Sequence, residues 1–204
     1  FQHDFQADDR NRIIWGLGYR FTHDVVGNTV PLAFCPTTLD QNLFSGFVQD
    51  EIELLKDLSF TMGTKVEHND YTGFEVEPSA RLQWKITPKQ TLWAAISRAV
   101  RTPSRIDRDL NEGTGIPAIP TLLEGGTDFD SESLIAYELG YRAQIGDKTS
   151  VSISTFYNDY DNIRSTGITQ DPSHLDLPLV FQNNLAGDTY GTEVSATQQL
   201  LDWW

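Results

Sequence analysis

Hydrophobic and polar residues alternate with a period of two along four segments of the chain. In the first segment Trp15, Leu17 and Tyr19 share one parity, and Gly16 and Gly18 lie between them. This period is typical of β-strands whose two faces meet different surroundings. Within these segments every charged side chain falls on the parity that is not apolar. The four predicted strands span residues 12–22, 58–67, 76–86 and 135–145.

Weaker alternation predicts five further strands, which brings the expected total to about nine. They span residues 1–6, 43–54, 91–100, 149–160 and 188–199. The face of the second of these is ambiguous, because Phe44, Phe47 and Val48 can share one face only across a bulge. Short turns alternate with long connections that are rich in Gly, Pro, Asn and Asp and read as loops. The long connections span residues 22–42, 101–133 and 161–187, and the whole pattern predicts an all-β, antiparallel up-and-down meander.

Four arginines occur in the stretch "TLWAAISRAVRTPSRIDRDL", residues 91–110, which has the look of a basic amphipathic helix. However, Leu92, Ala94 and Ile96 share one parity, so strand spacing explains the apolar part without a helix. A helix over residues 91–100 would contradict this interpretation. The arginines are Arg98 and Arg101, expected where the strand ends, and Arg105 and Arg108, expected in the following loop.

Composition narrows the classes of function. The chain has 204 residues, of which 39% are hydrophobic and 11% aromatic, too many for a disordered protein. Its formal net charge of −14 repels phosphate and disfavours nucleic acid as a partner. The lone Cys35 excludes an internal disulfide, and no run of about 18 apolar residues predicts a transmembrane helix. Both ends fall within structured sequence, so we expect a fragment of a longer polypeptide.

The apolar face of such strands can point to a soluble core or to lipid. Strands of about ten residues suit a tilted membrane crossing, whereas soluble strands average about five or six. Alternating short and long connections match the periplasmic turns and extracellular loops of an outer-membrane barrel. The mean hydropathy of −0.37 is compatible with a barrel, because half of the strand residues face a polar lumen. A membrane barrel is therefore favoured, with a soluble β-sandwich binding module as an alternative.

Several stretches together resemble the TonB-dependent receptors of the Gram-negative outer membrane. Residues 47–84, "FVQDEIELLKDLSFTMGTKVEHNDYTGFEVEPSARLQW", are similar to a "QDE" strand that leads to a "GxKxEHNDYTG" strand and a "PSARL" strand. Residues 92–104, "LWAAISRAVRTPS", resemble the strand that ends in a "FRAPS" motif, with Val100 and Thr102 as departures. The "ELG" and "FYNDYDN" of residues 131–163 and the "G-x-E" at Gly191 to Glu193 follow in the family's order.

This resemblance implies a barrel of about 22 strands around an N-terminal plug. It implies uptake of a scarce ligand such as a ferric siderophore, haem or cobalamin, energised by the TonB complex through an N-terminal box. Residues 1–204 would then be a partial barrel, with the plug, the box and the final strands outside it. The implied partners are outer-membrane lipid, lipopolysaccharide, the plug, the TonB complex and the small-molecule ligand; no cofactor is implied. A plug-free porin that works by passive diffusion stays open as an alternative, and the fragment alone is not expected to transport anything.

Two groups of charged residues are candidate contacts. We expect Arg98, Arg101, Arg105 and Arg108 to hold the plug or an anionic ligand, since guanidinium pairs well with carboxylates. The alternative is local pairing with Asp107, Asp109 and lumen acids, together with attraction to lipopolysaccharide phosphate. Eight charges are predicted to face the lumen, where they either guide the plug or substrate or pair across neighbouring strands. These are Lys65, Glu67, Glu77, Arg81, Lys85, Glu138, Arg142 and Glu193.

Catalytic and metal sites are not predicted. The histidines are scattered without ligand spacing, and residues 128–133 and 159–162 lack the Gly and Glu of a calcium loop. No nucleophile elbow, phosphate-binding Gly loop or convincing pair of catalytic carboxylates is present, so an enzyme is not expected. The histidines are His3, His23, His68 and His174.

Overall fold

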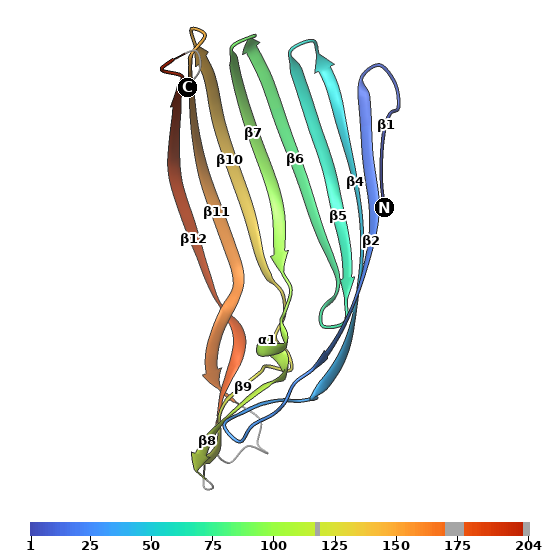
Figure 1. Cartoon of the computed structure of the whole chain (residues 1–204), viewed down its shortest axis with the longest axis vertical. Coiled ribbons are helices and arrows are strands. Elements are labelled where there is room, and N and C mark those ends of the chain that lie inside the picture. The colour runs from blue at the N-terminus through green and yellow to red at the C-terminus, as the bar shows by residue number, and fades with distance from the viewer. Residues whose placement is uncertain (117–118, 170–177, 202–204) are drawn as a thin grey trace.

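Long antiparallel strands build one curved sheet, which runs the length of the molecule (Figure 1). The computed structural model describes residues 1–116, 119–169 and 178–201. The elements are β1 (Gln2–Gln6), β2 (Asn11–Val25), β3 (Leu32–Phe34), β4 (Thr38–Leu55), β5 (Leu58–Asn69), β6 (Gly73–Thr87), β7 (Gln90–Arg101), α1 (Arg105–Asp109), β8 (Leu110–Ile116), β9 (Ile119–Glu124), β10 (Glu132–Ile145), β11 (Thr149–Ile168) and β12 (Leu179–Gln198). Their order in the sheet is β1-β2-β4-β5-β6-β7-β10-β11-β12-β9-β8-β3.

The predicted meander is confirmed, because nine of these strands follow the expected ones in order and each pairs with its neighbour. The expectation of plain loops is wrong for all three long connections, since residues 22–42 contain β3 together with the end of β2 and the start of β4. Residues 101–133 contain α1, β8 and β9, and the described parts of residues 161–187 extend β11 to Ile168 and begin β12 at Leu179. There the ladder between β11 and β12 continues to the pair Ile168 and Leu179, past register shifts beside Asn162, which has a φ of 57°. Backbone hydrogen bonds therefore extend β11 and β12 through a stretch where apolar and polar residues do not alternate.

The two faces of the sheet differ as the alternation predicts. Large apolar side chains such as Leu17, Tyr19 and Leu139 are 61%, 60% and 51% exposed on one side, which we call the apolar face. No second layer covers this face in the described part of the chain, and only Phe129 and Ala143 are buried apolar residues there. A β-sandwich would bury that face, so the fold is a segment of barrel wall instead.

The opposite side, the polar face, carries aromatic rings seated over glycines of the neighbouring strand. Phe47 lies over Gly16, where any added Cβ would clash with the ring. This resolves the ambiguous parity without a bulge: β4 pairs with β2 in continuous register, and Phe44 and Val48 stay on the apolar face. Trp93 is seated over Gly140 in the same way. Glycine in a strand interior here marks the close approach of a ring.

Carboxylates interrupt the alternation on the apolar face, where the ladder registers place Asp159 and Asp188 in one row with Ile135 and place Asp50 in β4. Asp50 of β4 pairs with Ile13 of β2 and Met62 of β5, both of them apolar-face residues. Its Oδ1 is buried and has no hydrogen-bond partner among the described residues. The alternation that excludes charges from the four strongest strands does not extend to β4.

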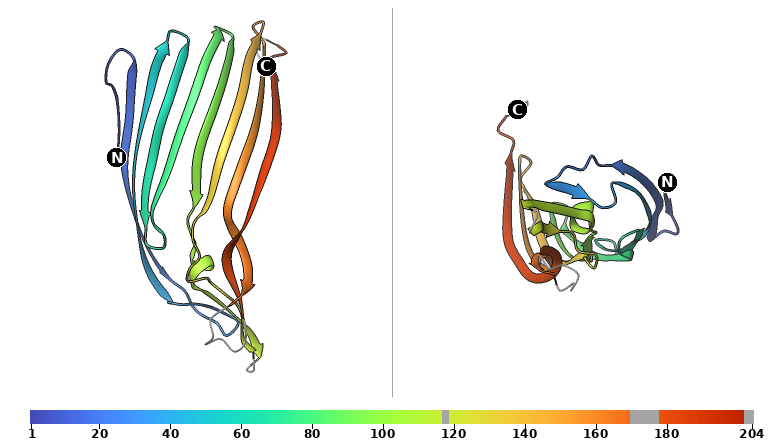
Figure 2. Two further views of the ribbon diagram at one scale, coloured as in Figure 1. Left: turned by 180° about the vertical axis from the view of Figure 1, so that it is seen from behind. Right: turned by 90° about the horizontal axis from the view of Figure 1, so that it is seen from below.

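The two ends of the sheet are built differently. Short turns join the strands at one end, the turn end, and the other end, the loop end, carries α1 and the three short strands (Figure 1). Viewed along the strands, the sheet forms an open arc with the segment from α1 to β9 drawn inside it (Figure 2). At the loop end β9 pairs with β12 and β3 pairs with β8, which ties three long connections together. No helix of the described residues is long and apolar enough to cross a membrane.

Candidate functional site

The arginine-rich stretch begins as a strand and ends as a helix. Residues 91–100 lie within β7, which confirms the strand prediction. Arg105 and Arg108 lie in α1, a single short helix, so the expectation of an irregular loop is wrong for these two. The reason is local: Ser104 precedes the helix, and Asp107 lies three residues later, as in a capping box. The Asp107 carboxylate accepts hydrogen bonds from the backbone N–H and the hydroxyl of Ser104, both at 2.8 Å.

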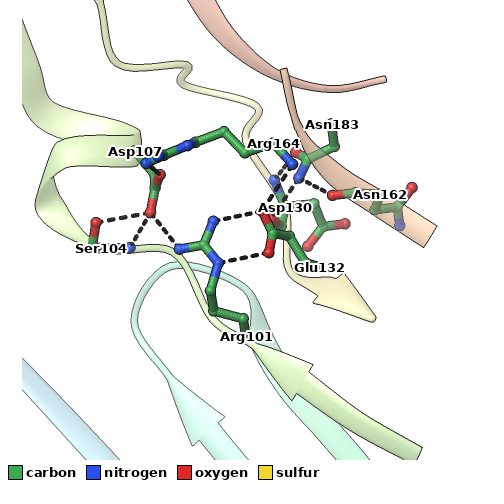
Figure 3. Close-up of polar contacts among 8 residues, drawn as sticks. All are labelled: Arg101, Ser104, Asp107, Asp130, Glu132, Asn162, Arg164 and Asn183. Carbon is green, nitrogen blue, oxygen red and sulfur yellow. Dashed lines mark hydrogen bonds and ion pairs between the residues drawn. The ribbon is translucent and has the colours of Figure 1, made fainter. Parts of the chain in front are cut away.

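Asp107 is the centre of a cluster that joins four elements at the loop end (Figure 3). Its side chain is 0% exposed, and its two oxygens accept bonds from Arg101 of β7 at 3.0 Å and Arg164 of β11 at 3.1 Å. Arg101 also binds Glu132 of β10 with two parallel bonds of 2.7 Å. The backbone N–H of Arg164 donates to the same Glu132 carboxylate at 2.8 Å. Two guanidiniums and two carboxylates therefore fix α1 against β7, β10 and β11.

The charge of Asp107 is strongly stabilised in this cluster. Burial alone would raise the pKa of its carboxyl, but hydrogen bonds from Ser104, Arg101 and Arg164 outweigh burial and lower the pKa to about 2. A buried carboxylate with several donors stays ionised throughout the neutral range.

A second group of contacts holds the other side of α1. Arg105 is buried and donates to Asp109 at 3.0 Å, to Asp24 of the β2 end and to the carbonyl of Pro36. Tyr71, in the turn after β5, donates its hydroxyl hydrogen to Asp109 at 2.6 Å. Burial and this hydrogen bond raise the pKa of the Tyr71 hydroxyl above its ordinary value.

Arg98 and Arg108 contact backbone carbonyls. The Arg98 position pairs with Ile135 on the apolar face, yet its guanidinium reaches the carbonyl of Val76 at 2.6 Å. This contact crosses the region where β6 and β7 part, since their ladder ends at Ser97. Arg108 donates to the carbonyl of Tyr71 at 2.8 Å, but its Nε is buried and unpartnered among the described residues.

The structure thus supports local pairing for Arg101 and Arg105, with Asp107 and Asp109 as the partners that the sequence indicated. Arg98 likewise lies 3.9 Å from Glu75, an acid of the polar face. The structure holds no plug or ligand, so contact of the four arginines with either stays a prediction. Three residues were not singled out from the sequence: Arg164 and Glu132 of the cluster, and Tyr71, which binds Asp109. Arg164 and Tyr71 lie in stretches that read as connections, and only the Ser104-to-Asp107 spacing gave a local signal.

All eight predicted lumen charges lie on the polar face, where the ladder registers align them in successive rows. Lys65 pairs with Glu67 at 2.7 Å and with Glu77 at 3.0 Å, as the cross-strand alternative expects. Arg81 and Arg142 form no ion pair with any described residue. Lys85, Glu138 and Glu193 likewise have none in the described ranges. Whether these charges guide a plug or substrate stays a prediction.

Metal ligands do not come together in the described ranges, where no three His, Cys, Asp or Glu side chains are placed to hold an ion. His23 contacts Asp40 at 2.5 Å, and His68 packs edge-on against Phe74. His3 stacks on Phe5. His174 lies outside the described residues.

Comparison with known proteins identifies the family. The whole chain, residues 1–204, matches the family described as TonB dependent receptor-like, beta-barrel. The iron-regulated outer membrane virulence protein of Vibrio cholerae is 24% identical over 173 residues, which are 81% of this chain and 26% of that protein. The ferric enterobactin receptor of Pseudomonas aeruginosa is 30% identical over 134 residues, 62% of this chain and 18% of that receptor. The chain therefore spans about a fifth to a quarter of these relatives.

Solved structures show the same fold. The siderophore receptor PirA of Acinetobacter baumannii superposes with a TM-score of 0.77 at 16% identity, over 98% of this chain and 34% of that one. A mutant ferric enterobactin receptor of Pseudomonas aeruginosa, solved in complex with enterobactin, gives 0.76 at 22% identity, over 98% and 33%. The sheet order, the exposed apolar face and the family match over the full chain all agree with one family. The chain belongs to the TonB-dependent receptor β-barrel family.

Proposed function

We propose that this chain forms part of the wall and extracellular loops of a TonB-energised uptake receptor in the bacterial outer membrane. The observation that supports it best is the sheet itself: long antiparallel strands expose an apolar face and turn a charged face inward, as a barrel in lipid requires. The free edge of β1, and that of β12 beyond its short pairing with β9, need further strands to pair with them in lipid. The complete receptor supplies those strands in this proposal.

The proposed cargo is a ferric siderophore or a similarly scarce nutrient such as haem or cobalamin. Two named relatives support this class, an iron-regulated outer membrane protein and a ferric enterobactin receptor. The arginine cluster supports a role for the loop end, because Arg101 and Arg164 are about half exposed there although carboxylates pair with them. Anionic ligands suit such guanidiniums. Arg105 is buried and serves to hold the loops in shape.

Uptake measurements test the proposal. The full-length gene is expressed in a bacterium that lacks its own siderophore receptors, and uptake of radiolabelled ferric enterobactin and other ferric siderophores is measured with and without TonB. We expect saturable uptake of at least one ferric siderophore, haem or cobalamin that disappears when TonB is removed. Uptake that is unsaturable and independent of TonB would favour the plug-free porin and contradict the proposal.

A matched pair of variants tests whether the arginine cluster at the loop end affects ligand binding. Arg101→Lys keeps the positive charge but loses the two parallel bonds to Glu132. Lys89→Gln removes an equally exposed cation from a turn at the opposite end, where it pairs with Asp147. We expect weaker ligand binding only from the first, measured as the Kd for the transported ligand on purified receptor.

A further inference from the structure

The Asp50 carboxylate lies on the apolar face without a partner. In the ladders Asp50 of β4 stands between Ile13 of β2 and Met62 of β5. Along its own strand it is flanked on that face by Val48 and Ile52. Its Oδ1 is covered by the protein, yet the carboxylate forms no hydrogen bond and no ion pair with any described residue. A carboxylate oxygen buried without a donor is costly, so a partner from outside the described chain is expected.

The surroundings of Asp50 differ from those of the other acids on this face. Asp159 and Asp188 are exposed and lie opposite each other towards the loop end. Arg12 of β2 is next to Ile13, but it belongs to the polar face, where its guanidinium binds Asp4 at 2.6 Å. The sheet therefore surrounds Asp50 with apolar side chains and directs the neighbouring cation away from it.

Asp50 lies near the turn end of the apolar face. Its partner Met62 is four residues beyond Leu58, the first residue of β5. Trp84 of β6 pairs with Leu58 and is 48% exposed on the same face. Tryptophan is enriched where the hydrocarbon of a membrane meets the lipid headgroups. Four residues of a strand rise about 13 Å, and less in depth because barrel strands are tilted, so Asp50 lies within reach of the headgroups at the turn end.

We propose that Asp50 binds the primary ammonium group of a phospholipid headgroup, as in phosphatidylethanolamine, at the periplasmic edge of the barrel. Charge complementarity selects this occupant, because a carboxylate attracts an ammonium group and repels the phosphate of an anionic lipid. A primary ammonium group also supplies the N–H donors that the carboxylate lacks. Ile13 and Met62 beside it keep water away, which strengthens the ion pair. This inference rests on the proposed function only in that the apolar face has to lie in lipid.

Zero-length crosslinking tests the contact in the full-length receptor, reconstituted into vesicles of phosphatidylethanolamine and phosphatidylglycerol. A membrane-permeant carbodiimide activates a carboxylate, and an amine in contact with it then forms an amide while the carbodiimide leaves as a urea. We expect peptide mass spectrometry to find phosphatidylethanolamine joined to Asp50. The product should be absent when phosphatidylcholine replaces phosphatidylethanolamine, because a quaternary ammonium group has no N–H to react. Glu51 is the matched internal control, since it is the next acid along β4 and belongs to the polar face.

Three results would overturn the proposal. The first is a lipid product on Asp50 no more abundant than on Glu51. The second is a rearranged acylurea as the only product of Asp50, which forms when no amine is within reach. The third is a crosslink from Asp50 to a lysine of a second receptor copy, which would assign this position to a protein interface. The crosslink needs no variant, so it stands even if a substitution at Asp50 prevents assembly.

Lipid affinity gives an independent readout. Asp50→Asn keeps the shape of the side chain and removes its charge, and Glu51→Gln does the same on the polar face. By native mass spectrometry of the full-length receptor, we expect only the first variant to bind phosphatidylethanolamine more weakly, by about fivefold, with phosphatidylglycerol unaffected. Unchanged binding in Asp50→Asn would contradict the contact. Neither readout needs a transported ligand or TonB. Failed uptake with a lipid product on Asp50 therefore contradicts the proposed function alone, and the reverse result contradicts this inference alone.

Discussion

Arginines at the two ends of the polar face have opposite surroundings. At the loop end, Arg101 touches two carboxylates, and Arg164 contacts the same pair. Towards the turn end, Arg81 and Arg142 flank Trp93 with no carboxylate in contact among the described residues. The chain has almost twice as many acidic as basic side chains, 29 against 15, so a shortage of acids does not explain the difference. The positions of the acids explain the difference, because Asp107 and Glu132 lie beside Arg101, whereas no acid lines the hollow that Arg81 and Arg142 share with Trp93 in the described residues.

The contrast separates arginines that stabilise the folded chain from arginines that are free to bind another group. A buried carboxylate such as Asp107 is tolerated only when hydrogen-bond donors surround it. The guanidiniums of Arg101 and Arg164 are therefore needed to hold the loops together. An exposed guanidinium over a tryptophan, such as that of Arg81, is stable in water without an acid and can still bind one. The following predictions test this distinction, from the largest expected effect to the smallest.

Removal of Asp107 should destabilise the loop end most. Asp107→Ala removes the buried carboxylate that joins Arg101 and Arg164, and each charged hydrogen bond lost contributes about 1.5–3 kcal/mol. We expect rapid proteolytic cleavage near α1 in the full-length receptor. Asp147→Ala is the control, because that carboxylate is 92% exposed in its pair with Lys89 and contributes little. Equal protease resistance of the two variants would refute the distinction.

Acid should reproduce part of this effect without a mutation. The pKa of Asp107 is about 2 in the folded chain against an ordinary value of 3.8, so folding favours its ionised form. The stabilisation is complete above pH 4 and is lost as the pH falls towards 2; the difference between the two values corresponds to about 2 kcal/mol. Hydrogen exchange of the Ser104 amide, which donates to Asp107, should accelerate beyond its intrinsic pH dependence in that window. An unchanged protection factor from pH 6 to pH 2.5 would show that Asp107 carries no such coupling.

The packing of the Trp93 ring against Gly140 can be tested by substituting that glycine. Gly140→Ala places a Cβ against the indole and displaces it from Arg81, at a cost of about 1–3 kcal/mol for overpacking. Gly187→Ala in β12 is the matched control, since open space surrounds that position. Urea unfolding followed by tryptophan fluorescence should shift for the first variant and not for the second. An equal shift in both variants would mean that the change in strand propensity, and not the clash with the Trp93 ring, sets the loss of stability.

Alternation of apolar and polar residues was enough to predict the long strands and their faces, because a barrel wall repeats one simple constraint along its length. It could not place Phe47, since the ring's position depends on Gly16 across the sheet, which no local window contains. It also could not foresee Asp50 on the apolar face.

The loop-end cluster was harder to predict for a related reason. Arg101 and Asp107 are six residues apart, but Arg164 is 57 residues beyond Asp107, and only the ladder between β10 and β11 brings it close. The sequence indicated Asp107 and Asp109 as partners of the arginines, but it gave no sign of Arg164 or Glu132. The register between neighbouring strands decides which arginine meets which carboxylate in this region.

The smallest effect is expected from Arg81 itself, and it is the one that separates the two kinds of arginine most directly. Arg81→Gln loses a contact with Trp93 worth about 0.5–1 kcal/mol, whereas Arg101→Gln removes charged hydrogen bonds to two carboxylates, each worth about 1.5–3 kcal/mol. Barrel unfolding, followed by heat-modifiable gel mobility, should shift slightly for the first variant and clearly for the second. Equal shifts would mean that Arg81 is as much a part of the barrel's own structure as Arg101. A small shift leaves the Arg81 guanidinium free for a partner from outside these 204 residues.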